Sequence, residues 1–194
     1  MEVIKLNKKN QQKTIGLATD YIKAGKIIIF PTDTVYGILC DAKNKKAVNR
    51  VFKIKKRLKQ KFFPVFVKDI KTAKNIAKIN KKEESFLKKC WPGKTTVVLE
   101  KKTFKIYGVD KKKIALRVPN YKPLNLLLKK MNAPLIQTSA NIAGKKPKKD
   151  PKEIIKDFKE RKLRPDLIID DGVLENKPST LINLTTSPYK ILRN

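Results

Sequence analysis

Apolar residues recur along this chain with two spacings, one typical of helices and one typical of buried strands. Helical spacing predicts helices over residues 11–24, 47–54, 70–79, 83–90, 124–131 and 152–158. Short apolar runs between turn residues predict strands over 3–6, 27–30, 65–67, 95–99, 114–118, 134–138, 167–170 and 180–184. Helices and strands that alternate along one chain indicate an α/β (α+β) fold around a single mixed sheet.

Two segments rich in hydroxyl and amide groups each follow a predicted strand. The first is Phe30-Pro31-Thr32-Asp33-Thr34-Val35-Tyr36-Gly37, whose three hydroxyl residues stand at every second position and would point the same way if extended. The second is Thr138-Ser139-Ala140-Asn141-Ile142-Ala143-Gly144. Strands that deliver polar loop residues to one rim of a sheet are typical of a binding site.

The residue types present restrict the chemistry. The chain has no histidine, which excludes Ser-His-Asp and Cys-His catalysis and the usual histidine ligands of zinc. Cys40 and Cys90 form no metal-binding spacing and are interpreted as small, partly buried thiols. Hydroxyls and cations dominate the two polar segments and also Lys55-Lys56-Arg57, Leu116-Arg117-Val118-Pro119 and Pro178-Ser179-Thr180. This composition favours an anionic ligand.

The formal net charge of +31 has two interpretations, and both stay open. A basic surface attracts RNA or DNA. Lysine is also what an AT-rich genome encodes wherever a surface tolerates it, and lysines are spread over nearly every predicted loop and helix face. Six of the 48 basic residues are arginines, and Arg57, Arg117 and Arg193 lie beside the segments named above. Arginine can bind a carboxylate or a phosphate through two hydrogen bonds.

Each of these segments, taken alone, also has a purely structural interpretation. Lys55-Lys56-Arg57 ends a predicted helix, so it is either a phosphate clamp or a solvated helix terminus. Residues 30–37 could be a proline-initiated turn, 138–141 an N-cap or Asx turn, and 178–180 a turn entering a strand. Gly93-Lys94-Thr95 is rejected as a P-loop, because position 88 is lysine rather than glycine and a strand follows.

In this order, the motifs resemble the YrdC/Sua5 family, the L-threonylcarbamoyladenylate synthases. The similarity runs from about Gly16 to Arg193. It implies an open twisted mixed sheet with flanking helices and a basic concave cavity, as in YrdC/RibB-like folds. It also implies a single YrdC-like domain over 1–194, without the C-terminal domain of the long Sua5 form. Its elements are Ala24-Gly25-Lys26, the segments at 31–37, 55–57, 116–119 and 139–144, Trp91-Pro92-Gly93, Ser179-Thr180 and Leu192-Arg193.

The resemblance implies a nucleotidyltransferase. L-Threonine and bicarbonate would form N-carboxy-threonine, which attacks the α-phosphorus of ATP and releases pyrophosphate. Magnesium would arrive with the nucleotide, so no metal site in the protein is expected. A separate transferase complex would then move the threonylcarbamoyl group to tRNA, which gives the modified nucleoside t6A.

The resemblance also implies roles for individual residues. Lys55 and Arg57 would form the catalytic, phosphate-contacting pair, and positioning with charge neutralisation would carry most of the rate. ATP would further contact Thr96, Ser139, Asn141 and Arg193. Threonine and carbamate would be held by Thr32, Tyr36, Arg117, Thr138 and Ser179, with Arg117 suited to a carboxylate.

The chain departs from the family pattern in several loops. Leu58, Phe62 and Lys94 stand where members usually have proline, and Pro178 stands where many have glutamate. The histidine that some members place near Val67 is also missing. None of these changes removes the Lys/Arg, Ser/Asn or Thr groups, and loss of proline alters loop stiffness more than chemistry.

Two alternative functions remain. The first is a non-catalytic module that binds double-stranded RNA or tRNA, although the scattered aromatic residues argue against a platform for single strands. Weak, salt-dependent tRNA binding could also accompany an enzyme. The second is the YrdC-like domain of hydrogenase maturation proteins, whose acylphosphatase and zinc-finger parts this chain lacks.

The expected location is the cytoplasm, without a membrane partner. The start, Met1-Glu2-Val3-Ile4-Lys5, lacks the apolar core of a signal peptide. No apolar run approaches the roughly 20 residues that span a bilayer.

Overall fold

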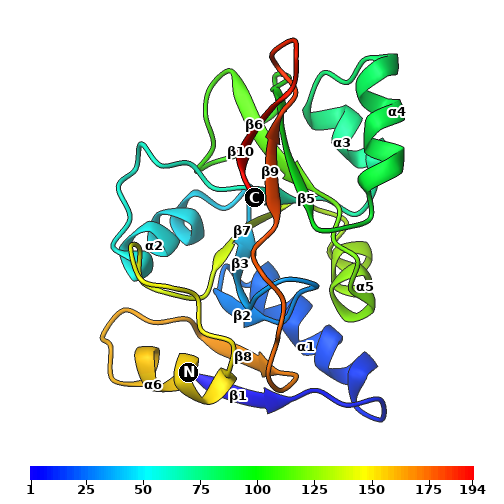
Figure 1. The fold of residues 1–194 in the computed structure, drawn as a ribbon. Coiled ribbons are helices and arrows are strands. Elements are labelled where there is room, and N and C mark those ends of the chain that lie inside the picture. Colours follow the sequence, from blue (N-terminus) through cyan, green and yellow to red (C-terminus); the bar gives the residue numbers. More distant parts are fainter.

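The computed structural model describes residues 1–194 and contains one twisted mixed sheet flanked by six helices (Figure 1). The helices are α1 (Gln11–Lys23), α2 (Lys45–Lys55), α3 (Ile70–Ile76), α4 (Lys81–Cys90), α5 (Lys122–Met131) and α6 (Pro151–Lys159). The strands are β1 (Glu2–Lys5), β2 (Ile28–Phe30), β3 (Gly37–Asp41), β4 (Val65–Phe66), β5 (Thr95–Glu100), β6 (Lys113–Arg117), β7 (Leu135–Ser139), β8 (Leu167–Asp170), β9 (Thr180–Asn183) and β10 (Lys190–Arg193).

The sheet has ten strands in the order β1-β8-β2-β3-β7-β4-β6-β5-β9-β10. Four pairs are parallel, namely β1 with β8, β2 with β8, β4 with β6 and β5 with β9, and the other five are antiparallel. The predicted fold class is therefore confirmed, and β1 is an edge strand as expected. Two strands, β3 and β10, were not predicted.

Strand alternation divides the buried apolar residues into two cores, one on each face of the sheet. Along β2, Ile29 joins the larger core, whereas Ile28 and Phe30 join the smaller one. Helices α2, α3, α4 and α6 contribute to the larger core of 32 residues. Helices α1 and α5, which lie against each other (Figure 1), cover the smaller core of 15 residues.

Helices α1 and α5 cover only one half of their face of the sheet, and no helix covers the other half. Phe66 on β4 belongs to the smaller core and pairs across the sheet with Leu135 on one side and Arg117 on the other. Beyond Phe66, the same face presents Ala115 on β6 and Thr96 on β5. Phe66 thus marks the border between an apolar half under helices and an open half that carries polar groups.

Local sequence fixes the element ends that matter for this open half. The Asn44 side chain accepts from the Ala47 amide and caps the start of α2. Lys56, in the left-handed region at φ 51°, ends α2 and turns the chain toward Arg57. A long irregular segment, residues 171–179, joins β8 to β9 across the six strands that lie between them (Figure 1). This crossing segment is called the strap below.

No helix combines the length and the apolar character that crossing a lipid bilayer would require.

Candidate functional site

A cavity of about 610 Å³ opens over the uncovered half of the sheet. It is large enough for a small-molecule ligand. Its apolar wall includes Phe62, Phe63, Val98 and Leu181, and its one acidic lining residue is Asp110. Eight residues singled out from the sequence line it, namely Arg57, Thr96, Arg117, Thr138, Ser139, Asn141, Ser179 and Arg193. Three of the six arginines of the chain therefore converge on one cavity.

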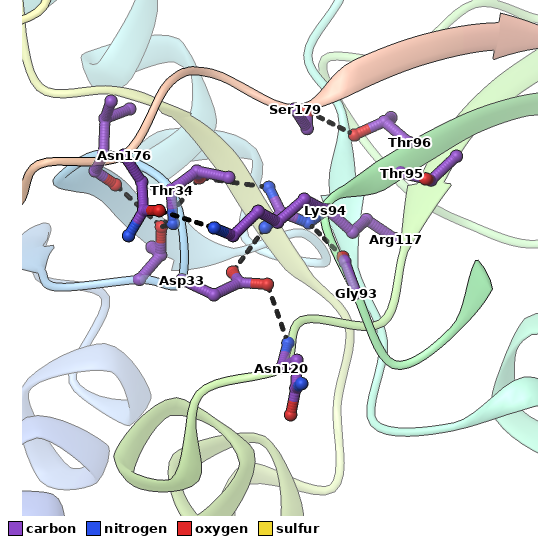
Figure 2. Close-up of polar contacts among 12 residues, drawn as sticks. Asp33, Thr34, Gly93, Lys94, Thr95, Thr96, Arg117, Asn120, Asn176 and Ser179 are labelled. Carbon is purple, nitrogen blue, oxygen red and sulfur yellow. Dashed lines mark hydrogen bonds and ion pairs between the residues drawn. The ribbon is translucent and has the colours of Figure 1, made fainter.

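Arg117, at the end of β6, is 1% exposed and held from several sides (Figure 2). Its Nε donates to the Gly93 carbonyl at 2.9 Å, and Nη1 donates to Thr34 Oγ1 at 3.2 Å. Nη2 forms an ion pair with Asp33. Burial lowers the pKa of Arg117, and the Asp33 carboxylate opposes that shift. A guanidinium has five N–H groups, so one N–H on each terminal nitrogen stays without a protein acceptor at the cavity.

Asp33 was not among the predicted site residues, although the structure gives it a central place. It is 8% exposed, and its second oxygen accepts from the Asn120 amide at 2.9 Å. A buried charge needs a partner, and Asp33 supplies it for Arg117. The signal in the sequence was the single acid inside a hydroxyl-rich loop.

Arg57 follows the end of α2 and also lines the cavity. Its Nε donates to the Lys61 carbonyl at 2.7 Å and its Nη2 to the Phe62 carbonyl at 3.0 Å. Its guanidinium lies 5.2 Å from the centre of the Phe63 ring. These contacts fix the loop that carries Leu58 and Phe62 around the guanidinium, and burial lowers its pKa.

The turn that leaves β7 presents Ser139 and Asn141 to the cavity. Ser139 Oγ donates to Asn141 Oδ1 at 2.5 Å, and the Asn141 amide group donates to the carbonyls of Ile142 and Lys145. Lys55 does not line the cavity and lies behind this turn. The phosphate contact expected of Lys55 therefore stays a prediction.

Ser179, at the end of the strap, contacts residues of β5 and β10 in the cavity wall. Its Oγ lies 2.8 Å from Thr96 Oγ1 on β5 (Figure 2). Arg193 on β10 donates to the Ser179 carbonyl through Nε at 3.0 Å and Nη2 at 2.6 Å. The unpredicted strand β10 thus brings a predicted residue, Arg193, to the cavity.

Thr32 and Tyr36 do not line the cavity. The segment bends at Asp33–Val35, so the extended backbone that would point the three hydroxyls the same way is not present. The Thr32 hydroxyl contacts Thr34 Oγ1 at 2.9 Å and supports the Thr34 side chain from behind. Tyr36 instead holds the strap, because its hydroxyl donates to the Gly172 carbonyl at 2.7 Å and accepts from the Asp171 amide at 2.9 Å.

The site is built for an anion with several acceptor groups. Arg57, Arg117 and Arg193, with Lys113 and Lys145, surround a partly apolar cavity in which charge is screened less than in water. No group of three or more His, Cys, Asp or Glu side chains that could hold a metal ion is present in residues 1–194. The expectation that magnesium enters with the nucleotide remains untested.

Comparisons with known proteins give one family. The Sua5_yciO_yrdC family model, described as telomere recombination, matches residues 20–194. A Methanocaldococcus jannaschii protein, provisionally named as a threonylcarbamoyl-AMP synthase, is 33% identical over 95% of this chain and 86% of its own length.

Solved structures agree with this match. Sua5 of Pyrococcus abyssi, in a crystal structure complexed with L-threonine, is 29% identical with a TM-score of 0.90. The match covers 100% of this chain but 57% of the Pyrococcus protein, so this chain spans little more than half of that relative. Escherichia coli YciO is 25% identical with a TM-score of 0.87, covering 100% of this chain and 94% of YciO. YciO itself is named as uncharacterised.

Proposed function

The chain belongs to the Sua5/YciO/YrdC family, and from this premise we propose that it is a threonylcarbamoyl-AMP synthase. In the proposed reaction L-threonine, bicarbonate and ATP give threonylcarbamoyl-AMP and pyrophosphate. The named synthases among its relatives support a transferase of this kind that serves tRNA modification to t6A.

One observation carries the proposal. In a chain whose basic residues are nearly all lysine, three of the six arginines line a single cavity together with Thr138, Ser139, Asn141 and Ser179. The two substrates that react are both anionic, one a carbamate with a second carboxylate and the other a triphosphate. Arginine binds both kinds of group through paired hydrogen bonds.

The contacts suggest a division of the cavity. Arg117, fixed by Asp33, has two free N–H groups and suits the carboxylate of threonine or its carbamate. Arg57 and Arg193 each retain N–H groups without protein acceptors and suit the phosphates. Ser139, Asn141 and Thr96 would orient the nucleotide. Such a site accelerates the reaction by alignment and by charge neutralisation at the α-phosphorus.

The remaining assignments follow from the same proposal. ATP enters with its magnesium, and Asp110 is the one acid in the cavity wall. A separate transferase complex consumes the product, and residues 1–194 form a single domain of the family. A non-catalytic RNA-binding role is not favoured, because the cavity has the size of a small-molecule site and the named relatives are enzymes.

The test is pyrophosphate release from MgATP and bicarbonate, with and without L-threonine, with identification of the nucleotide product by mass. We expect release that depends on threonine and a product with the mass of threonylcarbamoyl-AMP. Folded protein that releases no threonine-dependent pyrophosphate would overturn the proposal and leave the chain with the uncharacterised YciO relatives.

Two arginine variants assign the activity to the cavity. Arg57→Ala should lower turnover at least about a hundredfold, the scale for losing one donor to developing charge. Arg161→Ala is the matched control, because Arg161 follows α6, donates to the Asp157 carbonyl of that helix and does not line the cavity. Equal activity in both variants would remove Arg57 from the site.

A further inference from the structure

Lys55 is the last residue of α2, and its ammonium is committed to the protein itself. Its side chain is 1% exposed. Nζ lies 2.6 Å from the Ser139 carbonyl oxygen, 2.6 Å from the Asn141 carbonyl oxygen and 3.2 Å from Asn141 Oδ1. A lysine ammonium has three N–H groups, so these three acceptors use all of them.

The main chain repeats this connection. The Ala143 amide donates to the Lys55 carbonyl at 2.9 Å, so the end of α2 both donates to the turn and accepts from it. The same Asn141 side chain that accepts from Lys55 also accepts from Ser139 Oγ and donates to Lys145 O. Every member of the turn that faces the cavity is thereby connected to one buried cation.

The charge of Lys55 has no carboxylate to balance it. Burial and the nearby Arg57 guanidinium lower its pKa to about 7, and Lys55 forms no ion pair with a carboxylate. Burying an unpaired ammonium is costly unless its hydrogen bonds are satisfied. The oxygens of the turn after β7 provide that satisfaction, so the conformation of the turn and the position of Lys55 depend on each other.

We propose that Lys55 is a positioning residue that holds the Ser139–Asn141 turn in its binding conformation and does not itself contact the phosphates. This assignment replaces the direct phosphate contact expected from the sequence. Its functional part rests on the proposed nucleotide site, whereas the dependence of the turn on Lys55 stands without any ligand.

Hydrogen exchange without ligand tests the structural part. Lys55→Met keeps the volume and removes the ammonium, and Lys53→Met removes a charge from an exposed position of the same helix as a control. We expect amide exchange across 139–145 to rise on the order of tenfold or more in Lys55→Met and to stay unchanged in Lys53→Met. Unchanged exchange in both variants would overturn the proposal. If Lys55→Met fails to fold, Lys55→Gln, which retains amide donors, serves in its place.

Binding of ATP then separates positioning from direct contact. If Lys55 acts through the turn, Lys55→Met and Asn141→Ala each weaken ATP binding, and the double variant is scarcely weaker than the worse single variant. In the matched pair, Arg57→Ala and Asn141→Ala should weaken ATP binding additively. Additive losses for Lys55 with Asn141, together with lost affinity for inorganic pyrophosphate and unchanged exchange at 139–145, would show a direct phosphate contact and refute positioning.

An experiment can contradict the synthase assignment without contradicting the positioning role of Lys55. A protein that binds no ATP but loosens at 139–145 in Lys55→Met would contradict the synthase assignment and keep the role of Lys55.

Discussion

One face of the sheet consists of two halves with the same strand periodicity. One half forms an apolar core, and the other forms the wall of a cavity. In the half under α1 and α5, β2 and β8 contribute the apolar side chains of Ile28, Phe30, Leu167 and Ile169 to the smaller core, and Leu127 and Ile22 are completely buried. In the open half, the positions on the same face include Thr96, Ala115 and Arg117. The difference is whether a helix lies above the strands. Where none does, the same alternation that builds a core delivers polar groups into a cavity.

The two halves also differ in how they are stabilised. The covered half depends on apolar burial, and the open half depends on charges and hydroxyls that hold one another, with Asp33–Arg117 as its most buried ion pair. Substitutions in the covered half should therefore change stability alone, whereas substitutions in the open half should also change ligand binding.

The largest effect is expected at Arg117. Arg117→Leu leaves the Asp33 carboxylate buried without a counter-charge, so the free energy of unfolding should fall by about 3–5 kcal/mol. Threonine binding should be lost as well. Urea unfolding measures the first effect and calorimetric titration with L-threonine the second. The double variant Asp33→Leu with Arg117→Leu should recover most of the stability and none of the binding, and stability of the single variant within about 1 kcal/mol of wild type would contradict this reading.

The covered half should respond in stability alone. Leu127→Ala removes a fully buried side chain of α5 from the smaller core, so unfolding free energy should fall by about 2–5 kcal/mol. ATP and threonine affinity of the folded protein should be unchanged, because Leu127 lies outside the cavity. Weaker binding in the folded variant would mean that the two halves are coupled through Phe66.

The smallest effect is a dependence on pH that belongs to the open half. The pKa of Lys55 is lowered from 10.5 to about 7 by burial and by Arg57. Between these values the unfolded chain holds a proton that the folded chain has released. The contribution of Lys55 to the free energy of unfolding must therefore rise with pH above 7, by at most about 1.4 kcal/mol per pH unit.

Urea unfolding at pH 7, 8 and 9 checks this rise as the difference between wild type and Lys55→Met. The difference between wild type and Leu127→Ala should stay flat over the same range. A flat difference for Lys55→Met would mean that its pKa is not lowered in the folded protein.

Sequence periodicity was sufficient for most of the fold, and its failures have physical causes. Strand β3 was missed because Gly37–Asp41 directly continues a polar segment, and its apolar run is short. Strand β10 was missed because Lys190–Arg193 is exposed along its whole length and shows no alternation between a buried and a solvent face. Strand β10 forms because it pairs with β9, and no local sequence pattern indicates that pairing.

The sequence predicted most of the residues that line the candidate site, but it did not predict where all of their side chains point. The order of motifs identified eight residues that line the cavity, including the three arginines. The directions of Thr32, Tyr36 and Lys55 depend on a bend and on a helix end that sequence spacing does not determine. Asp33 could have been inferred from the partner that a buried arginine requires.

The pairing of β1 with β8 has a consequence for how fast the protein folds. Glu2 pairs with Leu167 and Lys5 with Asp170, so the first strand of the chain has no partner until the eighth has formed. The β5–β9 pair is similarly remote in sequence. To form such non-local contacts, a chain must first lose the conformational entropy of long loops. Proteins dominated by these contacts therefore fold in milliseconds to seconds rather than microseconds. Both pairs lie toward the ends of the strand order, and the middle strands can assemble before them.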